Sequence, residues 1–273
     1  HPSLDGRRRE LTTVQKGTRG MMRRSMVAGA LAVCAIAGMA GRAEAQAEGV
    51  WKGRGYIAVD GGAQASSSDF SSTVPFTLHG EDATFDATYT IKTGAIFAGR
   101  AGVRIWRNLA AGVGVTFFSK GGEAQIKGRL PHPFFFNKFR EVTGTASGLT
   151  REEIAVSPEV SWLVVLSKKM DMMLFAGPAF FTLKQNLATK LQFTEVYPFD
   201  TATFTGVESK TVSQSVVGFT AGADVSYLFS KSFAIGGTIR FARASAQLSP
   251  AGGPTATINP GGVQAGAGLR LRF

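Results

Sequence analysis

The stretch GGVQAGAGLRLRF, residues 261–273, decides the fold class of this chain. Alternate side chains of a β-strand point to opposite faces of a sheet. Small or apolar side chains occupy one of these faces, from Val263 to Phe273. The other face carries Arg270 and Arg272 between glycines. We therefore expect a strand with one wholly apolar face and one polar face.

The same alternation recurs in eight segments from residue 55 onward. The expected strands cover about 55–65, 92–105, 109–119, 152–166, 172–183, 213–229, 233–247 and 261–273. Tight turns are expected at 107–108, 167–171 and 230–232. Long polar loops are expected at 66–91, 120–151, 184–212 and 248–260. Short and long connections alternate, so all short turns should lie at one end of the sheet and all long loops at the other.

The composition narrows the class of protein. Hydrophobic residues make up 44% of the chain and charged residues only 18%, with 34 glycines and 21 phenylalanines, a mix that suits strands and turns. About half of the net charge of +11 lies in residues 1–45, which hold eight Lys/Arg against three Asp/Glu, and the rest is spread along the chain. The remaining basic residues form no cluster interleaved with aromatic residues, which argues against nucleic-acid binding.

The first 47 residues are interpreted as a targeting segment rather than as part of the fold. Residues 21–47 combine a short basic region, a 15-residue apolar run at 26–40 and A-x-A cleavage sites after Ala45 or Ala47, which is typical of a signal peptide. The alternative is a membrane anchor, for which 15 residues are short. Residues 1–20 are interpreted as an over-extended start. Cys34 lies in the apolar run, so the barrel, residues 48–273, should contain no disulfide.

These patterns predict an all-β fold, an eight-stranded antiparallel transmembrane up-and-down β-barrel. A bilayer core satisfies no backbone polar group, so only helices or closed barrels cross it, and no later apolar stretch reaches 18 residues. The alternative is a soluble sandwich or closed calyx. Its polar faces would carry many Lys and Glu, whereas these carry mostly Gly, Ser, Thr and Arg, which suit a cramped interior.

The chain resembles the small eight-stranded outer-membrane barrels of the OmpA/OmpX type. The residues that carry the resemblance are TGAIFAGRAGVRIWRN (93–108), the expected strand after it and the terminal LRLRF (269–273). The resemblance covers residues 50–273 and implies a location in the outer membrane of a Gram-negative bacterium. We expect a monomer. The resemblance also implies that Leu269, Leu271 and Phe273 are the signal read by the outer-membrane assembly machinery. Outer-membrane lipid and lipopolysaccharide are the other partners expected. The expected role is structural or interactive.

Strand parity directs nine charged side chains into the lumen: Asp60, Arg100, Arg104, Glu153, Glu159, Asp224, Arg240, Arg270 and Arg272. An eight-stranded barrel is just wide enough for side chains to fill it, and buried charges must be paired. We expect an ion-pair plug, with Arg100 and Arg104 beside Asp60. Glu153 and Glu159 should reach across the barrel to find a cation. The alternative is a narrow path for anions or other small solutes.

The second expected loop contains PHPFFFNKFR (131–140), which is rich in aromatic residues for a solvated segment. Its phenylalanines either pack over the barrel mouth or in lipid headgroups, or form a contact patch: Phe134, Phe135, Phe136 and Phe139. Nearby basic residues could meet lipopolysaccharide phosphates.

The remaining candidate sites are weak. His79 and His132 lie in expected loops, whereas a lipid-modifying hydrolase would hold its histidine, serine and acid on rigid strand ends. We therefore expect no catalytic residues, no metal site and no cofactor, with a lipid-modifying enzyme kept as an alternative. Pro158 and Pro178 interrupt expected strands almost opposite one another, which predicts a bulge or a local break.

Overall fold

The computed structural model describes residues 53–65, 69–248 and 256–273 of the chain. The expected over-extended start, signal peptide and cleavage sites fall in residues 1–47 and lie outside these ranges. The regular elements of the described residues are twelve β-strands. None of the described residues forms a helix of the length and apolarity that a membrane crossing needs.

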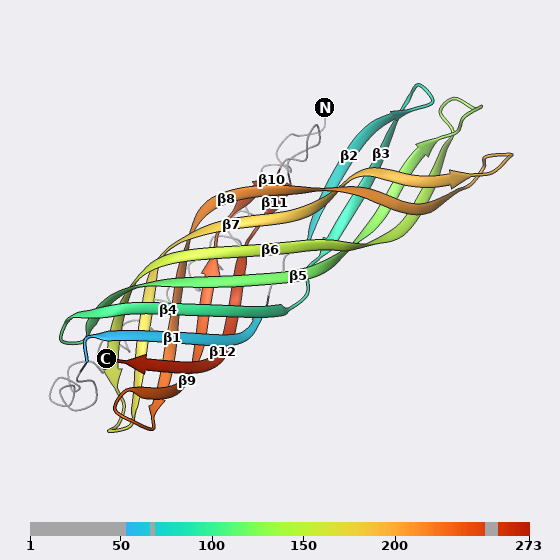
Figure 1. The fold of residues 1–273 in the computed structure, drawn as a ribbon. Coiled ribbons are helices and arrows are strands. Elements are labelled where there is room, and N and C mark those ends of the chain that lie inside the picture. Colours follow the sequence, from blue (N-terminus) through green and yellow to red (C-terminus); the bar gives the residue numbers. More distant parts are fainter. Residues whose placement is uncertain (1–52, 66–68, 249–255) are drawn as a thin grey trace, which may run out of the picture. The chain divides into compact units, whose positions relative to one another are not determined.

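Eight of the twelve strands form a closed ring (Figure 1). The strands are β1 (Gly55–Ala65), β2 (Phe70–Leu78), β3 (Glu81–Thr90), β4 (Gly94–Trp106), β5 (Leu109–Pro131), β6 (Phe139–Val165), β7 (Met170–Glu195), β8 (Ala202–Leu228), β9 (Phe233–Arg243), β10 (Ala246–Leu248), β11 (Ala256–Ile258) and β12 (Gly261–Arg272). The ring order is β1-β4-β5-β6-β7-β8-β9-β12, every neighbouring pair is antiparallel, and β12 pairs with β1 from Tyr56↔Arg272 to Ala65↔Val263. The expected fold class, an eight-stranded antiparallel barrel, is confirmed.

The connections of the ring alternate in length as expected. The short ones are residues 107–108, 166–169 and 229–232. At this same end the Phe273 amide donates to the Gly55 carbonyl at 3.0 Å, and the Gly55 amide donates to the Phe273 carbonyl at 2.7 Å. The first and last strands therefore begin and end at the short-turn end of the barrel.

Most of the residues expected in long polar loops are in strands, which corrects the sequence analysis. Away from the short-turn end, the parts of the strands that continue beyond the ring are called their upper parts. The upper parts of β5 and β6 pair as far as Pro131↔Phe139, and those of β7 and β8 as far as Glu195↔Ala202. The hairpin β2–β3 replaces most of the first loop, and β3 pairs with the upper part of β5 from Thr90↔Glu123 onward. We call β2, β3 and residues 119–131, 139–150, 182–195 and 202–216 the extension (Figure 1).

The ring and the extension have opposite polarity. In the ring, β5 exposes Val113 and buries Thr116, whereas in the extension the same strand exposes Lys127 and buries Ile126. An apolar core fills the extension and includes Phe85, Tyr89, Leu130, Val142, Leu149, Leu183, Leu187 and Leu191. A wall with apolar side chains outside suits lipid, and one with polar side chains outside suits water. The loops were mispredicted because their buried residues alternate with Ser, Thr, Gly and charged residues.

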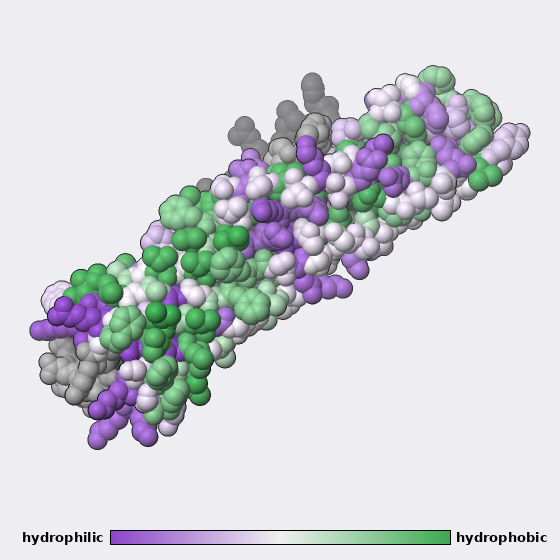
Figure 2. Space-filling model, in the orientation of Figure 1, coloured by the Kyte–Doolittle hydropathy of each residue, from purple (hydrophilic) through white to green (hydrophobic). Residues whose placement is uncertain are grey.

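A belt of exposed apolar side chains surrounds the ring, and Figure 2 shows it as the green region over this part. On β8 the belt runs from Val217 to Tyr227. At ~3.3 Å per residue and a strand tilt of ~40°, this span is about 25 Å high, the height of the apolar band of outer-membrane barrels. Exposed aromatic residues lie near both edges of the belt: Phe97, Phe117, Phe180, Phe219 and Phe241 toward the extension, and Trp106, Trp162, Tyr227, Phe229, Phe233 and Phe273 at the short-turn end.

Pro158 and Pro178 lie opposite one another on β6 and β7. The ladder pairs Val156↔Phe180 and Val160↔Ala176 in the same register, and no pairs are formed between these two. The prolines thus produce a local break without a bulge, one of the two outcomes expected. A Cβ on Gly177 would lie 1.9 Å from the Pro158 carbonyl oxygen, so the two strands approach closely at the break.

Candidate functional site

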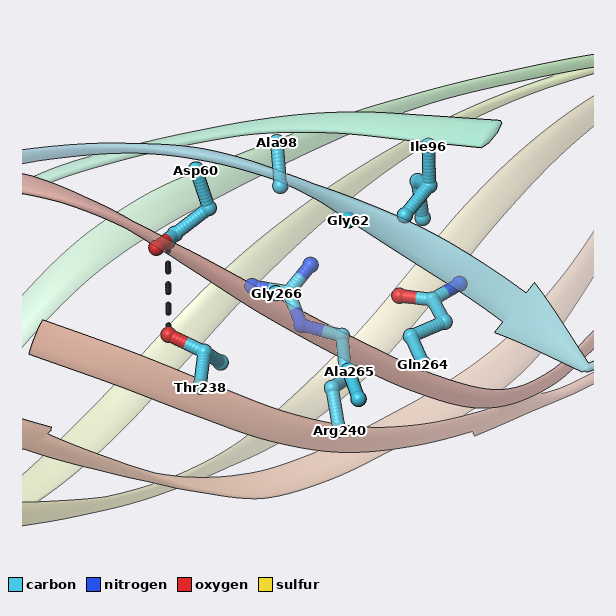
Figure 3. A pocket seen from close by; sticks show the side chains of 9 residues that line it. All are labelled: Asp60, Gly62, Ile96, Ala98, Thr238, Arg240, Gln264, Ala265 and Gly266. Carbon is cyan, nitrogen blue, oxygen red and sulfur yellow. Dashed lines mark hydrogen bonds between the residues drawn. The ribbon is translucent and has the colours of Figure 1, made fainter. Parts of the chain in front are cut away.

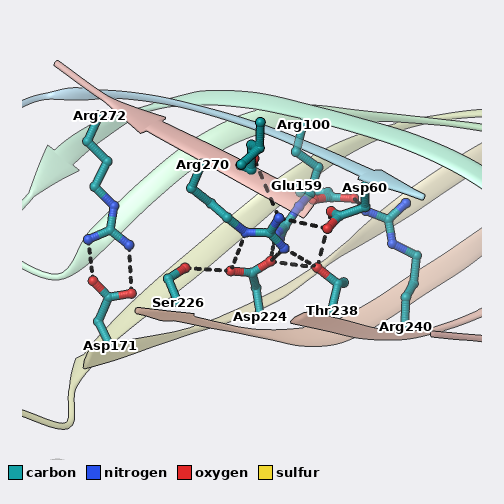
Figure 4. A network of polar contacts seen from close by, with 11 residues as sticks. Asp60, Arg100, Glu159, Asp171, Asp224, Ser226, Thr238, Arg240, Arg270 and Arg272 are labelled. Atoms are coloured by element: carbon teal, nitrogen blue, oxygen red, sulfur yellow. Dashed lines mark hydrogen bonds and ion pairs between the residues drawn. The ribbon is translucent and has the colours of Figure 1, made fainter. Parts of the chain in front are cut away.

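The nine charged residues directed inward by parity lie on the inner wall of the ring. Eight of them are buried, with relative exposures of 3–6%, and Arg104 is half-buried. Two further charged residues, Arg151 and Asp171, are also buried there. The described lumen therefore contains charges from seven of the eight ring strands, and their contacts form the network drawn in part in Figure 4.

The centre of this network joins two arginines to two carboxylates. Arg270 forms ion pairs with Asp60 at 2.7 Å and with Asp224, and Arg100 reaches Asp224 at 2.7 Å. The Thr238 hydroxyl donates to Asp224 at 2.5 Å and accepts from Arg270 at 2.9 Å. The four charged residues come from four different strands, so this neutral cluster ties the barrel wall together across the lumen.

Arg240 and Glu159 form a second layer, 3.4 Å apart. The Ser157 hydroxyl donates to the Glu159 carboxylate at 2.7 Å, which holds that carboxylate in place. The guanidinium groups of Arg100 and Arg240 lie 4.2 and 5.0 Å from the ring centre of Phe175. A cation over an aromatic face is attracted by the ring quadrupole, so Phe175 stabilises both arginines where water is scarce.

The layer nearest the extension contains Arg151 and Glu153. Arg151 donates to Glu153 at 2.5 Å, and Glu153 also accepts from the Gly261 amide at 2.9 Å and from Gln64 at 3.2 Å. The expectation that Glu153 reaches across the barrel for a cation is wrong, because Arg151 lies two residues away on the same strand. Arg151 was missed because it fell in an expected loop.

Arg272 and Asp171 close the short-turn end of the lumen through two parallel hydrogen bonds, one of them 2.7 Å long. Sequence reasoning missed Asp171, which it placed in a tight turn, because the fifth strand is apolar on both faces and its phase is ambiguous. The expected pairing of Arg100 with Asp60 is also corrected. Arg100 lies opposite Ala58 in the ladder and crosses the lumen to Asp224.

The described part of the lumen contains a small free space beside the charged layers. A small cavity of about 20 Å³ adjoins Arg240, Asp60 and Thr238 (Figure 3). Its other lining residues are Gly62, Ile96, Ala98, Gln264, Ala265 and Gly266. A volume of this size holds about one water molecule. The lumen is therefore packed with paired side chains at this level.

The second candidate site is the far end of the extension, formed by three hairpin turns, residues 79–80, 132–138 and 196–201, which we call the tip. Buried Arg140 connects two of these hairpins. It donates to Glu195 at 2.5 Å and to the carbonyls of Phe199 and Pro131 at 2.9 and 2.8 Å. The third turn is joined through Glu81, which accepts from the amide of residue 137 at 2.9 Å.

The phenylalanines of the second expected loop are divided by the structure. Phe134, Phe135 and Phe136 lie exposed at the tip, whereas Phe139 begins β6 and carries the Arg129 guanidinium 3.5 Å from its ring centre. The tip lies 13 residues along β5 beyond Phe118, about 40 Å of strand. The expectation that these rings pack over the barrel mouth or in the surrounding headgroups is therefore wrong, because the extension lifts them away.

His79 and His132 both lie at the tip. His132 is buried, its Nδ1 accepts from the Phe134 amide at 3.2 Å, and its Nε2 lies 3.7 Å from the Asp200 carboxylate. His79 Nε2 lies 3.9 Å from Glu195. The described residues contain no group of three or more His, Cys, Asp or Glu side chains placed to hold a metal ion. Lys138, hydrogen-bonded to Asp200 at 2.6 Å, holds the pKa of that carboxyl below its ordinary value.

No protein-family model and no curated protein sequence matches the chain. Among solved structures it is similar to the Neisserial surface protein A, with 13% identity, a TM-score of 0.44 and coverage of 80% of this chain and 97% of that one. It is similar to the outer membrane protein OprG from Pseudomonas aeruginosa, with 9% identity, a TM-score of 0.46 and coverage of 82% and 97%. It is also similar to the outer membrane protease OmpT from Escherichia coli, with 9% identity, a TM-score of 0.44 and coverage of 81% of this chain and 97% of that one. At these similarities none of their activities carries over, and the barrel fold follows from the closed ring of strand pairs.

Proposed function

We propose that this protein is an outer-membrane β-barrel whose lumen is closed and whose function is to anchor and present the extension outside the cell. The belt height, the aromatic residues at its edges and the short-turn end support an outer-membrane location. In such barrels the short turns face the periplasm, so the tip would face outward. Lipid and lipopolysaccharide would contact the belt and the extension.

The observation that carries the closed lumen is the ion-pair network. Five buried arginines and five buried carboxylates, in the four layers described above, occupy the space that solutes would need. Beyond the last layer the interior does not become aqueous, because the apolar core of the extension begins there, with Leu149 and Leu183 fully buried. An ion would meet a paired polar plug and then a dry apolar region.

The last strand supports the proposed route into the membrane. Leu269 and Phe273 are exposed on the outer face of the ring and Leu271 is half-buried on the same face. These positions leave the alternating apolar side chains accessible to an assembly machinery before the belt meets lipid. We propose them as the assembly signal.

The experiment that tests the closed lumen is a planar-bilayer recording of the purified full chain. We expect no steady conductance, and at most rare small openings. Stable, long-lived channels would overturn the proposal and favour a small-solute channel. Release of fatty acid from lipopolysaccharide or phospholipid by the same preparation, lost in His132→Ala, would instead favour a lipid-modifying enzyme.

A further inference from the structure

The tip carries an apolar surface that the fold does not cover. Phe136 and Tyr197 are 80% and 79% exposed, more than the large apolar residues of the lipid-facing belt. The complete set of exposed large apolar residues at the tip is Phe134, Phe135, Phe136, Val196 and Tyr197, which we call the tip patch. Large aromatic groups exposed together mark a binding surface rather than an ordinary solvated turn.

The tip patch spans two hairpin turns and is held as one surface. Phe199 packs against Phe134 with ring centres 5.5 Å apart and against Tyr197 at 6.0 Å. The Arg140 side chain fixes the backbone beneath these rings through its bonds to Glu195 and to the Phe199 carbonyl. The rings therefore project from a preformed support, which reduces the loss of conformational entropy on binding.

We propose that the tip patch inserts into the headgroup region of an apposed lipid bilayer with zwitterionic headgroups. This inference deepens the proposed function and rests on it, because it names what the presented tip would meet. The most exposed side chains lie on the turns themselves, so the surface is a protrusion rather than a pocket. Aromatic side chains at such a protrusion are the residues that membrane interfaces favour.

The charges beside the tip patch match a zwitterionic headgroup. Lys138 and Asp200 are 2.6 Å apart with side chains 49% and 55% exposed, and the Lys138 ammonium lies 5.2 Å from the Phe135 ring centre. The ammonium can meet a lipid phosphate while the carboxylate meets a choline or ethanolamine group. Two further carboxylates lie at the tip: Glu195 pairs with Arg140, and Glu81 accepts from the amide of residue 137. No excess of positive charge is present to require anionic lipid.

The protein's own membrane is out of reach of the tip patch. The 13 residues of β5 between Phe118 and Pro131 span about 40 Å of strand, or about 30 Å of height at the usual tilt. The aromatic residues of the belt already occupy the interface of the membrane that holds the barrel. The tip patch would therefore contact a second membrane.

The test is flotation of the full chain, held in lipid nanodiscs, with vesicles of phosphatidylcholine alone. We expect the protein to float with the vesicles more than empty nanodiscs do. The double variant Phe136→Ser, Tyr197→Ser should reduce the vesicle-bound fraction at least tenfold. The matched control is Lys190→Ser, Glu208→Ser, which removes an exposed 3.1 Å ion pair of the extension outside the tip and should leave binding within twofold. Circular dichroism and heat-dependent mobility in detergent gels establish that each variant is folded.

Three results would overturn the proposal. They are a folded wild type that does not float, a folded double variant that floats like the wild type, and binding only to membranes that carry proteins, which would indicate a protein partner. The bilayer recording separates this inference from the proposed function. If the barrel conducts but still binds vesicles through Phe136 and Tyr197, only the closed lumen is refuted. If the barrel does not conduct and the tip does not bind vesicles, only the lipid contact is refuted.

Discussion

Replacing Asp224 by alanine should destabilise the barrel by about 3–5 kcal/mol, the cost of removing one partner from a buried ion pair. Asp224 pairs with both Arg100 and Arg270 and accepts a hydrogen bond from Thr238. In the variant Arg270 keeps its 2.7 Å contact with Asp60. Arg100 loses its buried carboxylate and retains the Phe175 ring, so the cost should come mainly from that one guanidinium.

The measurement is urea unfolding of the barrel refolded into phospholipid vesicles, followed by the fluorescence of Trp106 and Trp162 on the belt. The matched control is Asp86→Ala, an exposed aspartate of the extension that accepts from Thr73, and it should change the free energy of unfolding by less than about 1 kcal/mol. A loss below about 1 kcal/mol for Asp224→Ala would refute the reasoning, because it would mean that water reaches Arg100 and solvates it.

Three further predictions test the belt, the closing strand and the tip. Val113 is a belt residue with 47% of its surface exposed, and Val113→Arg should lower the free energy of unfolding by about 2–4 kcal/mol in the same assay. Labelling of a Val113→Cys variant by a membrane-impermeant thiol reagent would contradict this prediction. Deleting Phe273 should lower outer-membrane levels in fractionated cells, because its backbone pairs with Gly55 and its ring covers that glycine, and unchanged levels would refute the signal. Because Lys138 lowers the pKa of Asp200, the pair should persist as the pH falls through ~3.9 and be lost only below it. An NMR titration of the Asp200 carboxyl should show its midpoint at a higher pH in Lys138→Met than in the wild type. An unchanged midpoint would contradict this prediction.

The ring could be predicted from the sequence because lipid imposes a strict rule on it. Each ring strand must turn apolar side chains outward, and the period of two then directs Asp60, Arg100 and Asp224 inward without knowledge of their partners. The pairing itself could not be predicted in the same way. Whether Arg100 meets Asp60 or Asp224 depends on the stagger and curvature of the whole barrel, which no single strand encodes.

The extension escaped prediction for a different physical reason. Above Phe117 the solvent outside the wall changes from lipid to water, so an outward residue becomes polar and an inward one apolar while the backbone continues unchanged. A search for outward apolar faces ends at this boundary and interprets the rest as loop. Arg151 marks the same boundary on β6, as the last charged residue of the lumen below the apolar core.

The inversion of polarity also explains how the chain can hold a surface far from its membrane. Isolated two-stranded hairpins are marginally stable in water, and turns as distant as those of the tip would be poorly fixed by hairpins alone. Here β2, β3 and the upper parts of β5 to β8 share one apolar core, which includes Phe85, Leu130 and Leu187. The strands β6, β7 and β8 continue from the belt into this core, and each also carries a charged residue of the lumen network, so the ion pairs and the core of the extension stabilise the same three strands. A loss of either should therefore loosen the other, and with it the support beneath the tip patch.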